Sequence, residues 1–220
     1  MTDVTTSQVE AGQAAYGRLT LRVYDALVLG ASCSWLWKCP SDTLLARYNS
    51  LVSANHLDVG VGSGFFLDRC AFPVASPRVA LMDLNENSLA FTARRIARYQ
   101  PETYRRNVLE DMTVSNGGFD SVGMNLLLHC VPGDFAYKGC IFDHALKVMN
   151  PGAVLFGATI LGKDIGRNWG ARRLMAVYNR KGIFSNLEDS EQALRKALSA
   201  RFSDVSIELQ GCMALFSARV

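Results

Sequence analysis

Glycines stand at every second position after an aspartate in the segment Asp58-Val59-Gly60-Val61-Gly62-Ser63-Gly64. The apolar residues before them are typical of a short strand, so the glycines form a turn between that strand and a helix. Glycine lets the backbone approach a ligand closely and adopt dihedral angles that a Cβ atom forbids. A second apolar strand ends in Asp83, whose carboxylate is placed to accept hydrogen bonds from two ribose hydroxyls. Together these features predict a site for a nucleoside-containing cofactor.

The spacing of the glycines separates two classes of such cofactors. The dinucleotide fingerprint is G-x-G-x-x-G, and Phe65 stands where its third glycine would be. An acid beside the loop repels a pyrophosphate but suits a ligand that carries an amino group and a sulfonium. A nicotinamide-dependent oxidoreductase is therefore disfavoured. A glycine turn without a ligand is also disfavoured, because Asp83 stands at the distance expected of a ribose-binding acid.

The elements that must position these residues alternate between strand and helix patterns from residue 55 onward. Strands are expected near 55–59, 78–83, 104–109, 119–126 and 153–160, and helices near 41–51, 63–71, 86–98, 138–149 and 190–201. Alternation of this kind gives a parallel sheet covered by helices on both faces. Strands at 204–210 and 212–219 form a closing hairpin. We expect an α/β, Rossmann-like, doubly wound, mostly parallel seven-stranded sheet with an antiparallel C-terminal hairpin strand and small helical lids.

Four ordered motifs resemble those of the class I S-adenosylmethionine-dependent methyltransferases. Leu57 to Gly64 is similar to the first motif of that family, and Asp83 matches its ribose-binding acid. The segment from Phe119 to Gly133 resembles the motif around the fourth strand. The segment from Leu146 to Gly152 resembles the helix end and Asn-Pro-Gly turn that precede the fifth strand. The resemblance covers residues 55–160 by motif and the closing hairpin by layout.

This resemblance implies S-adenosyl-L-methionine as the cofactor. One departure concerns the end of the third strand, where many relatives carry an acid and this chain has Asn107. The Asn107 amide oxygen can still accept a hydrogen bond from the adenine amino group, but without charge. The cofactor residues that the resemblance implies are Asp58, Gly60, Gly62, Gly64, Asp83, Leu84, Asn107, Val108 and Asn125.

His129 is the candidate catalytic residue, because it follows the fourth strand at the edge of the sheet where ligands bind. A histidine with a pKa near neutrality can accept a phenolic or alcoholic proton. Methyl transfer from a sulfonium needs such a base only if the acceptor arrives protonated. The alternative is a histidine that packs beneath the lid and hydrogen-bonds to the backbone, and both interpretations stay open.

Two segments rich in aromatic residues flank the expected cofactor core. In the family that this chain resembles, segments before the first strand and after the fifth cover the methyl donor. We expect a single domain with an N-terminal helical lid (1–50), a cofactor-binding core (51–160), a second lid (161–187) and a closing helix and hairpin (188–220). The aromatic residues would line an acceptor pocket or pack the lids onto the sheet. The substrate candidates among them are Tyr16, Tyr24, Trp35, Trp37, Trp169 and Tyr178.

Composition narrows the possible partners. A net charge of +3 without basic clusters disfavours nucleic acid, and no apolar run approaches the roughly 18 residues of a membrane helix. The six cysteines form no CxxC pair, so no metal site is expected. Since the first fifteen residues do not read as a secretory signal, we expect reduced thiols in a cytoplasmic protein. The oligomeric state stays open.

The sequence thus predicts a methyltransferase for a small, largely apolar or aromatic metabolite, with oxygen as the expected acceptor atom. A compact enzyme with small lids fits a pathway of secondary metabolism. The alternative is a protein of the same fold that uses the bound cofactor structurally, as a non-methylating catalyst or an interaction partner.

Overall fold

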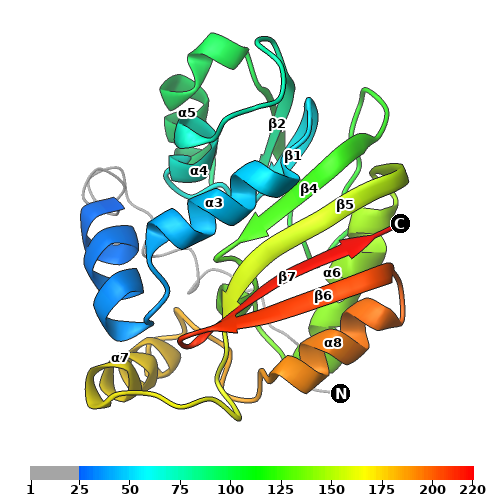
Figure 1. Ribbon diagram of the computed structural model, residues 1–220. Helices are drawn as coiled ribbons and strands as arrows, with labels where there is room; N and C mark the ends of the chain where they lie inside the picture. The colour runs from blue at the N-terminus through cyan, green and yellow to red at the C-terminus, as the bar shows by residue number, and fades with distance from the viewer. Residues whose placement is uncertain (1–24) are drawn as a thin grey trace.

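The seven strands lie in the order β3-β2-β1-β4-β5-β7-β6 (Figure 1). Neighbouring strands from β3 to β5 pair in parallel, and β7 runs antiparallel to both β5 and β6. The predicted mostly parallel sheet with an antiparallel strand from the closing hairpin is therefore confirmed. The strand order reverses between β1 and β4, and ligands of open α/β sheets bind at the carboxyl ends of the strands beside such a reversal.

The structure, a computed structural model, describes residues 25–220. The strands are β1 (Asn55–Val59), β2 (Arg78–Asp83), β3 (Glu102–Arg105), β4 (Phe119–Asn125), β5 (Met149–Ile160), β6 (Ser203–Gln210) and β7 (Met213–Arg219). The helical elements are η1 (Asp25–Leu36), α3 (Ser41–Leu51), α4 (Phe65–Arg69), α5 (Glu86–Arg95), η2 (Ala97–Tyr99), η3 (Leu128–Cys130), α6 (Phe135–Leu146), α7 (Trp169–Arg180) and α8 (Glu191–Ser199).

The largest differences from the predicted bounds concern two strands. The third strand ends at Arg105 rather than at residue 109, because Asn107 starts a turn: its carbonyl accepts the N–H of Glu110 and its side-chain oxygen that of Leu109. The fifth strand begins at Met149 and runs through the predicted Asn-Pro-Gly stop. That tripeptide is accommodated by a shift in the pairing of β5 with β4, where Gly152 has a φ of 77°.

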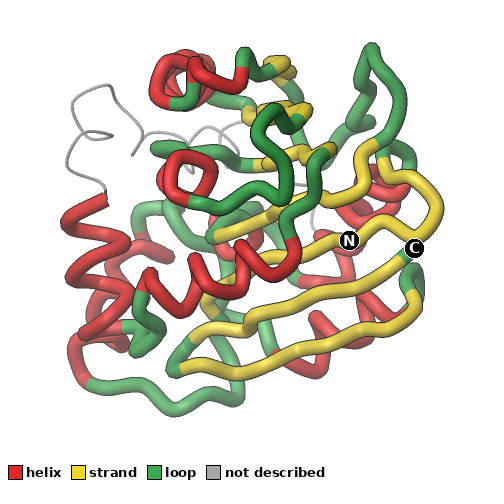
Figure 2. The backbone as a smooth tube through the Cα atoms, turned by 45° about the horizontal axis from the view of Figure 1, so that its top comes forward, coloured by secondary structure: helices red, strands yellow, loops and turns green. Residues whose placement is uncertain are grey.

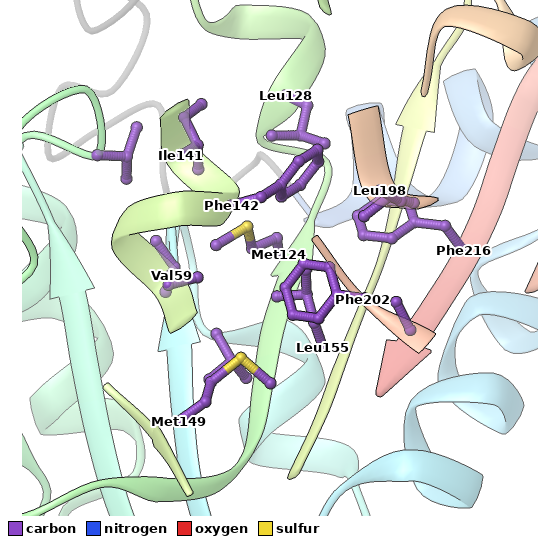
Figure 3. Close-up of a cluster of buried hydrophobic side chains, with 14 of the residues drawn as sticks. Val59, Met124, Leu128, Ile141, Phe142, Met149, Leu155, Leu198, Phe202 and Phe216 are labelled. Carbon is purple, nitrogen blue, oxygen red and sulfur yellow. The ribbon is translucent and has the colours of Figure 1, made fainter. Parts of the chain in front are cut away.

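Alternate residues of each strand face opposite sides of the sheet, and helices cover both sides (Figure 2). Leu57 and Val59 of β1 belong to an apolar cluster with α6 and α8, which we call the α6–α8 core. His56 and Asp58 point the other way and contact α3. Figure 3 shows the α6–α8 core, with ten of its residues labelled: Val59, Met124, Leu128, Ile141, Phe142, Met149, Leu155, Leu198, Phe202 and Phe216.

Three further findings concern residues 25–220. Their helices are all too short or too polar to cross a membrane. They contain no group of three or more histidine, cysteine, aspartate or glutamate residues that could hold a metal ion. All six cysteines of the chain fall in this range, and the structure gives none of them a disulfide bond.

Candidate functional site

Two adjoining cavities lie at the carboxyl ends of β1, β2 and β4, which we call the cofactor edge. The larger, of about 100 Å³, is lined by Gly60, Gly62, Asp83, Leu84, Asn85, Arg106, Asn107, Val108, Leu109, Leu126, Leu127, Cys130, Val131 and Pro132. The smaller, of about 40 Å³, is lined by Asp58, Leu126, Asn125 and residues 60–67. The structure thus brings all nine predicted cofactor residues to one edge of the sheet. Leu126 and Leu127 were not predicted, because a leucine in an apolar run carries no signal of a ligand contact.

The glycine loop joins the two cavities, and its glycines answer different needs. All three have positive φ values, and Gly62 and Gly64 have 51° and 72°. A Cβ atom on Gly64 would lie 2.7 Å from Cγ2 of Thr92, so the packing of α5 requires glycine there. A Cβ atom on Gly62 would have nothing within 4 Å, because this residue borders the open cavities. The packing of the fold therefore does not require glycine at position 62, but a glycine there leaves room for a ligand.

Asp83 ends β2 at the rim of the larger cavity. Its Oδ1 accepts the N–H of Asn85 at 2.8 Å, and Asn85 in turn caps α5. Burial raises the pKa of Asp83 to about 6, although the N–H groups of Asn85 and Gly62 act in the opposite direction. At neutral pH the side chain is a carboxylate that is poorly hydrated and available to hydroxyl donors.

Asp58 is the acidic residue of the smaller cavity. Tyr48 of α3 donates a hydrogen bond from its hydroxyl to Asp58 Oδ2 at 2.7 Å. Tyr48 lies ten residues before Asp58, in a helix that the sequence does not connect with the glycine motif. Its contact with the site therefore comes from the packing of α3 on β1.

Asn125 and Leu126 complete the smaller cavity at the end of β4. Asn125 Nδ2 is buried and has no hydrogen-bond partner among residues 25–220. Leu126 has a φ of 59°, in the left-handed region that a bulky side chain rarely adopts, and its N–H donates to Ala158. A buried donor without a partner is costly, so Asn125 presents the cavity with a group that a ligand can satisfy.

His129 lies apart from this geometry. It is 4 % exposed and is not among the described lining residues of either cavity. Its Nδ1 accepts the N–H of Ile160 at 3.3 Å, and its ring packs edge-on against Phe184, with 4.6 Å between centroids. Burial, with a smaller contribution from the charge of Lys138, lowers the pKa of His129 to about 3. The structure thus places His129 in buried surroundings with a hydrogen bond to the backbone, as the packing interpretation expects.

The predicted aromatic lining is also absent from both described cavities. Tyr16 and Tyr24 lie outside the described residues. Trp37 is 2 % exposed and Tyr178 is half-buried, and both pack against the ring of Phe184. Trp35 and Trp169 are 80 % and 72 % exposed. The two segments that were predicted to be lids meet at these tryptophans, since Asn168 Nδ2 donates to the carbonyls of Trp35 and Leu36 at 3.2 and 3.3 Å.

The chemistry of the two cavities matches the two halves of one ligand. The larger cavity combines mostly apolar side chains with the Asp83 carboxylate, a combination that suits an adenosine. The smaller cavity offers Asp58 to an ammonium group and Asn125 Nδ2 to a carboxylate, a pair that suits an amino acid. The Gly62 backbone runs between the two. The described residues therefore fit S-adenosylmethionine.

Comparisons with known proteins agree with this assignment. A family model described as a methyltransferase domain matches residues 57–155. The chain is 41 % identical over 211 residues to demethylluteothin O-methyltransferase of Streptomyces thioluteus, covering 96 % of this chain and 92 % of that protein. It is 38 % identical to the physcion biosynthesis cluster O-methyltransferase of Aspergillus chevalieri, covering 95 % of each.

Among solved structures, DhpI in its complex with SAH (S-adenosylhomocysteine) has the same fold. The TM-score is 0.71 at 14 % sequence identity, and the match covers 98 % of each chain. The cofactor of this enzyme is S-adenosylmethionine, as the resemblance of its motifs implied. By its motifs, its sheet and its relatives, the chain belongs to the class I S-adenosylmethionine-dependent methyltransferases.

Proposed function

We propose that this enzyme methylates an oxygen atom of a small, largely apolar or aromatic metabolite. The observation that carries the proposal is the similarity, over nearly the whole chain, to two proteins that are named as O-methyltransferases. The sequence similarity to these two proteins also covers the segments outside the cofactor core, which supports an acceptor site of related shape. A role in secondary metabolism fits the same relatives.

The residues of the cofactor edge have separate roles in this proposal. Asp83 accepts hydrogen bonds from the two ribose hydroxyls. The amide oxygen of Asn107 accepts a hydrogen bond from the adenine amino group. Asp58 receives the amino group of the methionine part and Asn125 Nδ2 its carboxylate, while Gly62 lies against the chain between them. When bound, S-adenosylmethionine supplies a methyl group that its sulfonium has already activated, so the protein contributes mainly proximity and alignment.

The proton of the acceptor is the remaining chemical question. Of the described residues that line the two cavities, none is a histidine, and the only carboxylates are Asp58 and Asp83, which have cofactor roles. This favours an acceptor oxygen that is already ionised near neutral pH, such as that of a carboxylate, an acidic phenol or an acidic enol. We therefore assign no general base to this enzyme.

The two lids are the proposed source of acceptor contacts, since the cofactor edge is taken up by the donor. Trp35 and Trp169 are large, exposed and joined through Asn168. Exposed aromatic rings of this size can bury an apolar acceptor and keep water from the sulfonium. Trp37 and Tyr178 would support them from beneath. Cysteines without disulfide bonds are consistent with a reducing compartment, and we place the enzyme in the cytoplasm.

The proposal is tested with the purified protein, S-adenosylmethionine and a panel of phenols, enols, carboxylic acids and amines. The expected result is stoichiometric release of S-adenosylhomocysteine with a phenol or enol, and NMR of the product showing a new O-methyl group. N-methylation of an amine in place of any oxygen would overturn the choice of acceptor atom. Tight donor binding without turnover on any acceptor would favour the structural use of the cofactor.

Once an acceptor is known, Trp35→Ala and Trp169→Ala test the lids. Each should raise the acceptor KM at unchanged affinity for S-adenosylhomocysteine. Leu209→Ala is the matched control, because Leu209 is an exposed apolar residue of β6 outside the lids and the described cavity linings. Equal acceptor kinetics in all three variants and the wild type would show that the exposed tryptophans have no part in acceptor binding.

A further inference from the structure

A chain of hydrogen bonds runs from the inside of the protein to Asp58. Tyr48 Oη lies 2.7 Å from both Asp58 Oδ2 and His56 Nε2. On the other side of the ring, His56 Nδ1 lies 2.8 Å from Ser121 Oγ, which accepts the N–H of Ser53 at 2.9 Å. We propose that Tyr48 and His56 are positioning residues, which fix the Asp58 carboxylate so that it receives the amino group of the methyl donor.

The sheet itself aligns the members of this chain. In the pairing of β1 with β4, His56 is opposite Ser121 and Asp58 is opposite Gly123. A Cβ atom on Gly123 would lie 3.2 Å from His56 Cε1 and 3.4 Å from Asp58 Oδ2, so a glycine there gives both side chains room. The alternation of the strand puts His56 and Asp58 on one face, and α3 covers them with Tyr48.

The two donors nearest to Asp58 point toward it. A phenol has one hydroxyl proton, and Tyr48 uses it to donate a hydrogen bond to the Asp58 carboxylate. The Tyr48 oxygen must then accept from His56 Nε2, because two acceptors 2.7 Å apart would repel each other. Nε2 therefore carries a proton whatever the charge of the ring. Burial, and then the charge of Asp58, raises the pKa of Tyr48 well above its usual value, so the phenol stays a donor.

The surroundings hold the donor ring rigidly. The Tyr48 ring stacks on Phe66, with 5.5 Å between centroids and 8° between planes, and meets Phe156 edge-on at 5.1 Å. Tyr48, His56 and Ser121 are fully buried. Buried polar chains are costly to assemble but rigid once every member has a partner. A hydrogen-bonded chain that ends on the Asp58 carboxylate therefore fixes the position of that carboxylate at the ligand. Apolar packing of the same strands would not do so.

This inference rests on the proposed contact of Asp58 with the donor's amino group, and the test separates the two. S-adenosylhomocysteine carries the amino acid, whereas 5′-methylthioadenosine keeps the adenosine and the sulfur but lacks it. Calorimetry on the wild type, Tyr48→Phe and the matched control Tyr104→Phe compares the two ligands. Tyr104 has a hydroxyl that donates to Glu102 and lies outside the described linings of both cavities.

The expected result is that Tyr48→Phe loses about tenfold or more in affinity for S-adenosylhomocysteine, as for a hydrogen bond to a charged group. Its affinity for methylthioadenosine should stay within about twofold. Tyr104→Phe should match the wild type with both. Equal losses for the two ligands would show a merely structural role, and no loss would show that Tyr48 does not act on the site; either overturns the inference.

A wild type that binds the two ligands equally would contradict the proposed role of Asp58 itself. If Tyr48→Phe does not fold, ¹⁵N NMR of the wild-type imidazole decides. A proton on His56 Nε2 supports the chain. A ring protonated at Nδ1 alone would reverse the direction of the hydrogen bonds and overturn the inference.

Discussion

The α6–α8 core and the cofactor edge are built from the same strands in opposite ways. Val59 and Met124 lie in the core, where both are completely buried among apolar side chains. One residue further along each strand, Gly60 and Asn125 begin the cofactor edge. There Leu126 has a left-handed backbone and Asn125 Nδ2 has no partner among residues 25–220.

The difference shows where this enzyme tolerates unfavourable groups. Side chains in the core contribute to the free energy of unfolding through burial alone. At the edge, the strained backbone of Leu126, the unpaired Asn125 Nδ2 and the raised pKa of Asp83 lie where a ligand can compensate for them. We therefore expect core substitutions to change the free energy of unfolding with little change in the affinity for S-adenosylhomocysteine. Edge substitutions should mainly change that affinity.

Phe142→Ala should have the largest effect and tests the core. Phe142 is fully buried in α6 and meets the rings of Phe202 and Phe216, with 6.4 and 6.5 Å between centroids. The substitution should lower the free energy of unfolding by about 3–5 kcal/mol, measured by urea denaturation. The affinity of the folded protein for S-adenosylhomocysteine should stay within about twofold. A loss of affinity without a loss of stability would contradict the contrast between the α6–α8 core and the cofactor edge.

Asp83→Ala and Asp83→Asn test the edge. Two hydrogen bonds to a charged group are each worth about 1.5–3 kcal/mol, so either substitution should weaken S-adenosylhomocysteine binding at least about tenfold in calorimetry. Asparagine keeps an oxygen for the N–H of Asn85, so a loss of affinity in this variant is not caused by a lost helix contact. Unchanged affinity in a folded Asp83→Asn protein would contradict the ribose assignment.

The pH dependence of Asp83 sharpens the same test. Because the pKa in the folded protein is about 6, above that of an unfolded aspartate, the stability linked to this group is present below about pH 4 and is lost as the pH rises through 6. Ligand-free Asp83→Asn should therefore gain stability relative to the wild type between pH 4 and 7. Wild-type affinity for S-adenosylhomocysteine should fall below pH 6, since a protonated carboxyl no longer accepts both hydroxyls.

His129→Leu tests whether this residue belongs with the core. The substitution leaves the buried N–H of Ile160 without its acceptor and should lower stability by about 1–3 kcal/mol. With a folded pKa of about 3, below the usual 6.5, the stability that His129 contributes is present above pH 6.5 and lost as the pH falls toward 3. Urea denaturation at several pH values should show that the variant loses less stability than the wild type as the pH falls, because it has no imidazole to protonate.

Turnover of the same His129→Leu variant distinguishes the two interpretations of the residue. A packed histidine predicts nearly normal turnover for each folded molecule. A loss of about 10²–10⁴ in turnover at normal S-adenosylhomocysteine affinity would instead restore the general base.

Gly62→Ala and Gly64→Ala compare two glycines of one loop and should have the smallest effects. Positive φ makes alanine unfavourable by about 1–2 kcal/mol at either position. Gly64→Ala adds a clash with Thr92 and should lose more stability. Gly62→Ala should lose less stability but at least about fivefold in S-adenosylhomocysteine affinity, which corresponds to about 1 kcal/mol. Equal affinity in Gly62→Ala and the wild type would show that the loop is only a turn.

The sequence was most informative where local pattern and function coincide. The glycine spacing and the acid after the second strand predicted residues that the structure gathers around two joined cavities. It was least informative about side chains whose role depends on distant neighbours. His129 follows the fourth strand as predicted, but the segment carrying Phe184 covers it. Trp37 and Trp169 are equally aromatic, yet one is buried and the other is exposed.

By itself, the sequence determined the α/β class, the closing hairpin and the cofactor motif, because each depends on the period of apolar residues or on a short fixed spacing. Only the tertiary structure decided which polar groups meet. Tyr48, His56 and Ser121 come from a helix and two strands, and the register of β1 on β4 and the packing of α3 unite them. Hydrogen bonds need atoms placed within a few tenths of an ångström, and such placement comes from packing across the whole sheet.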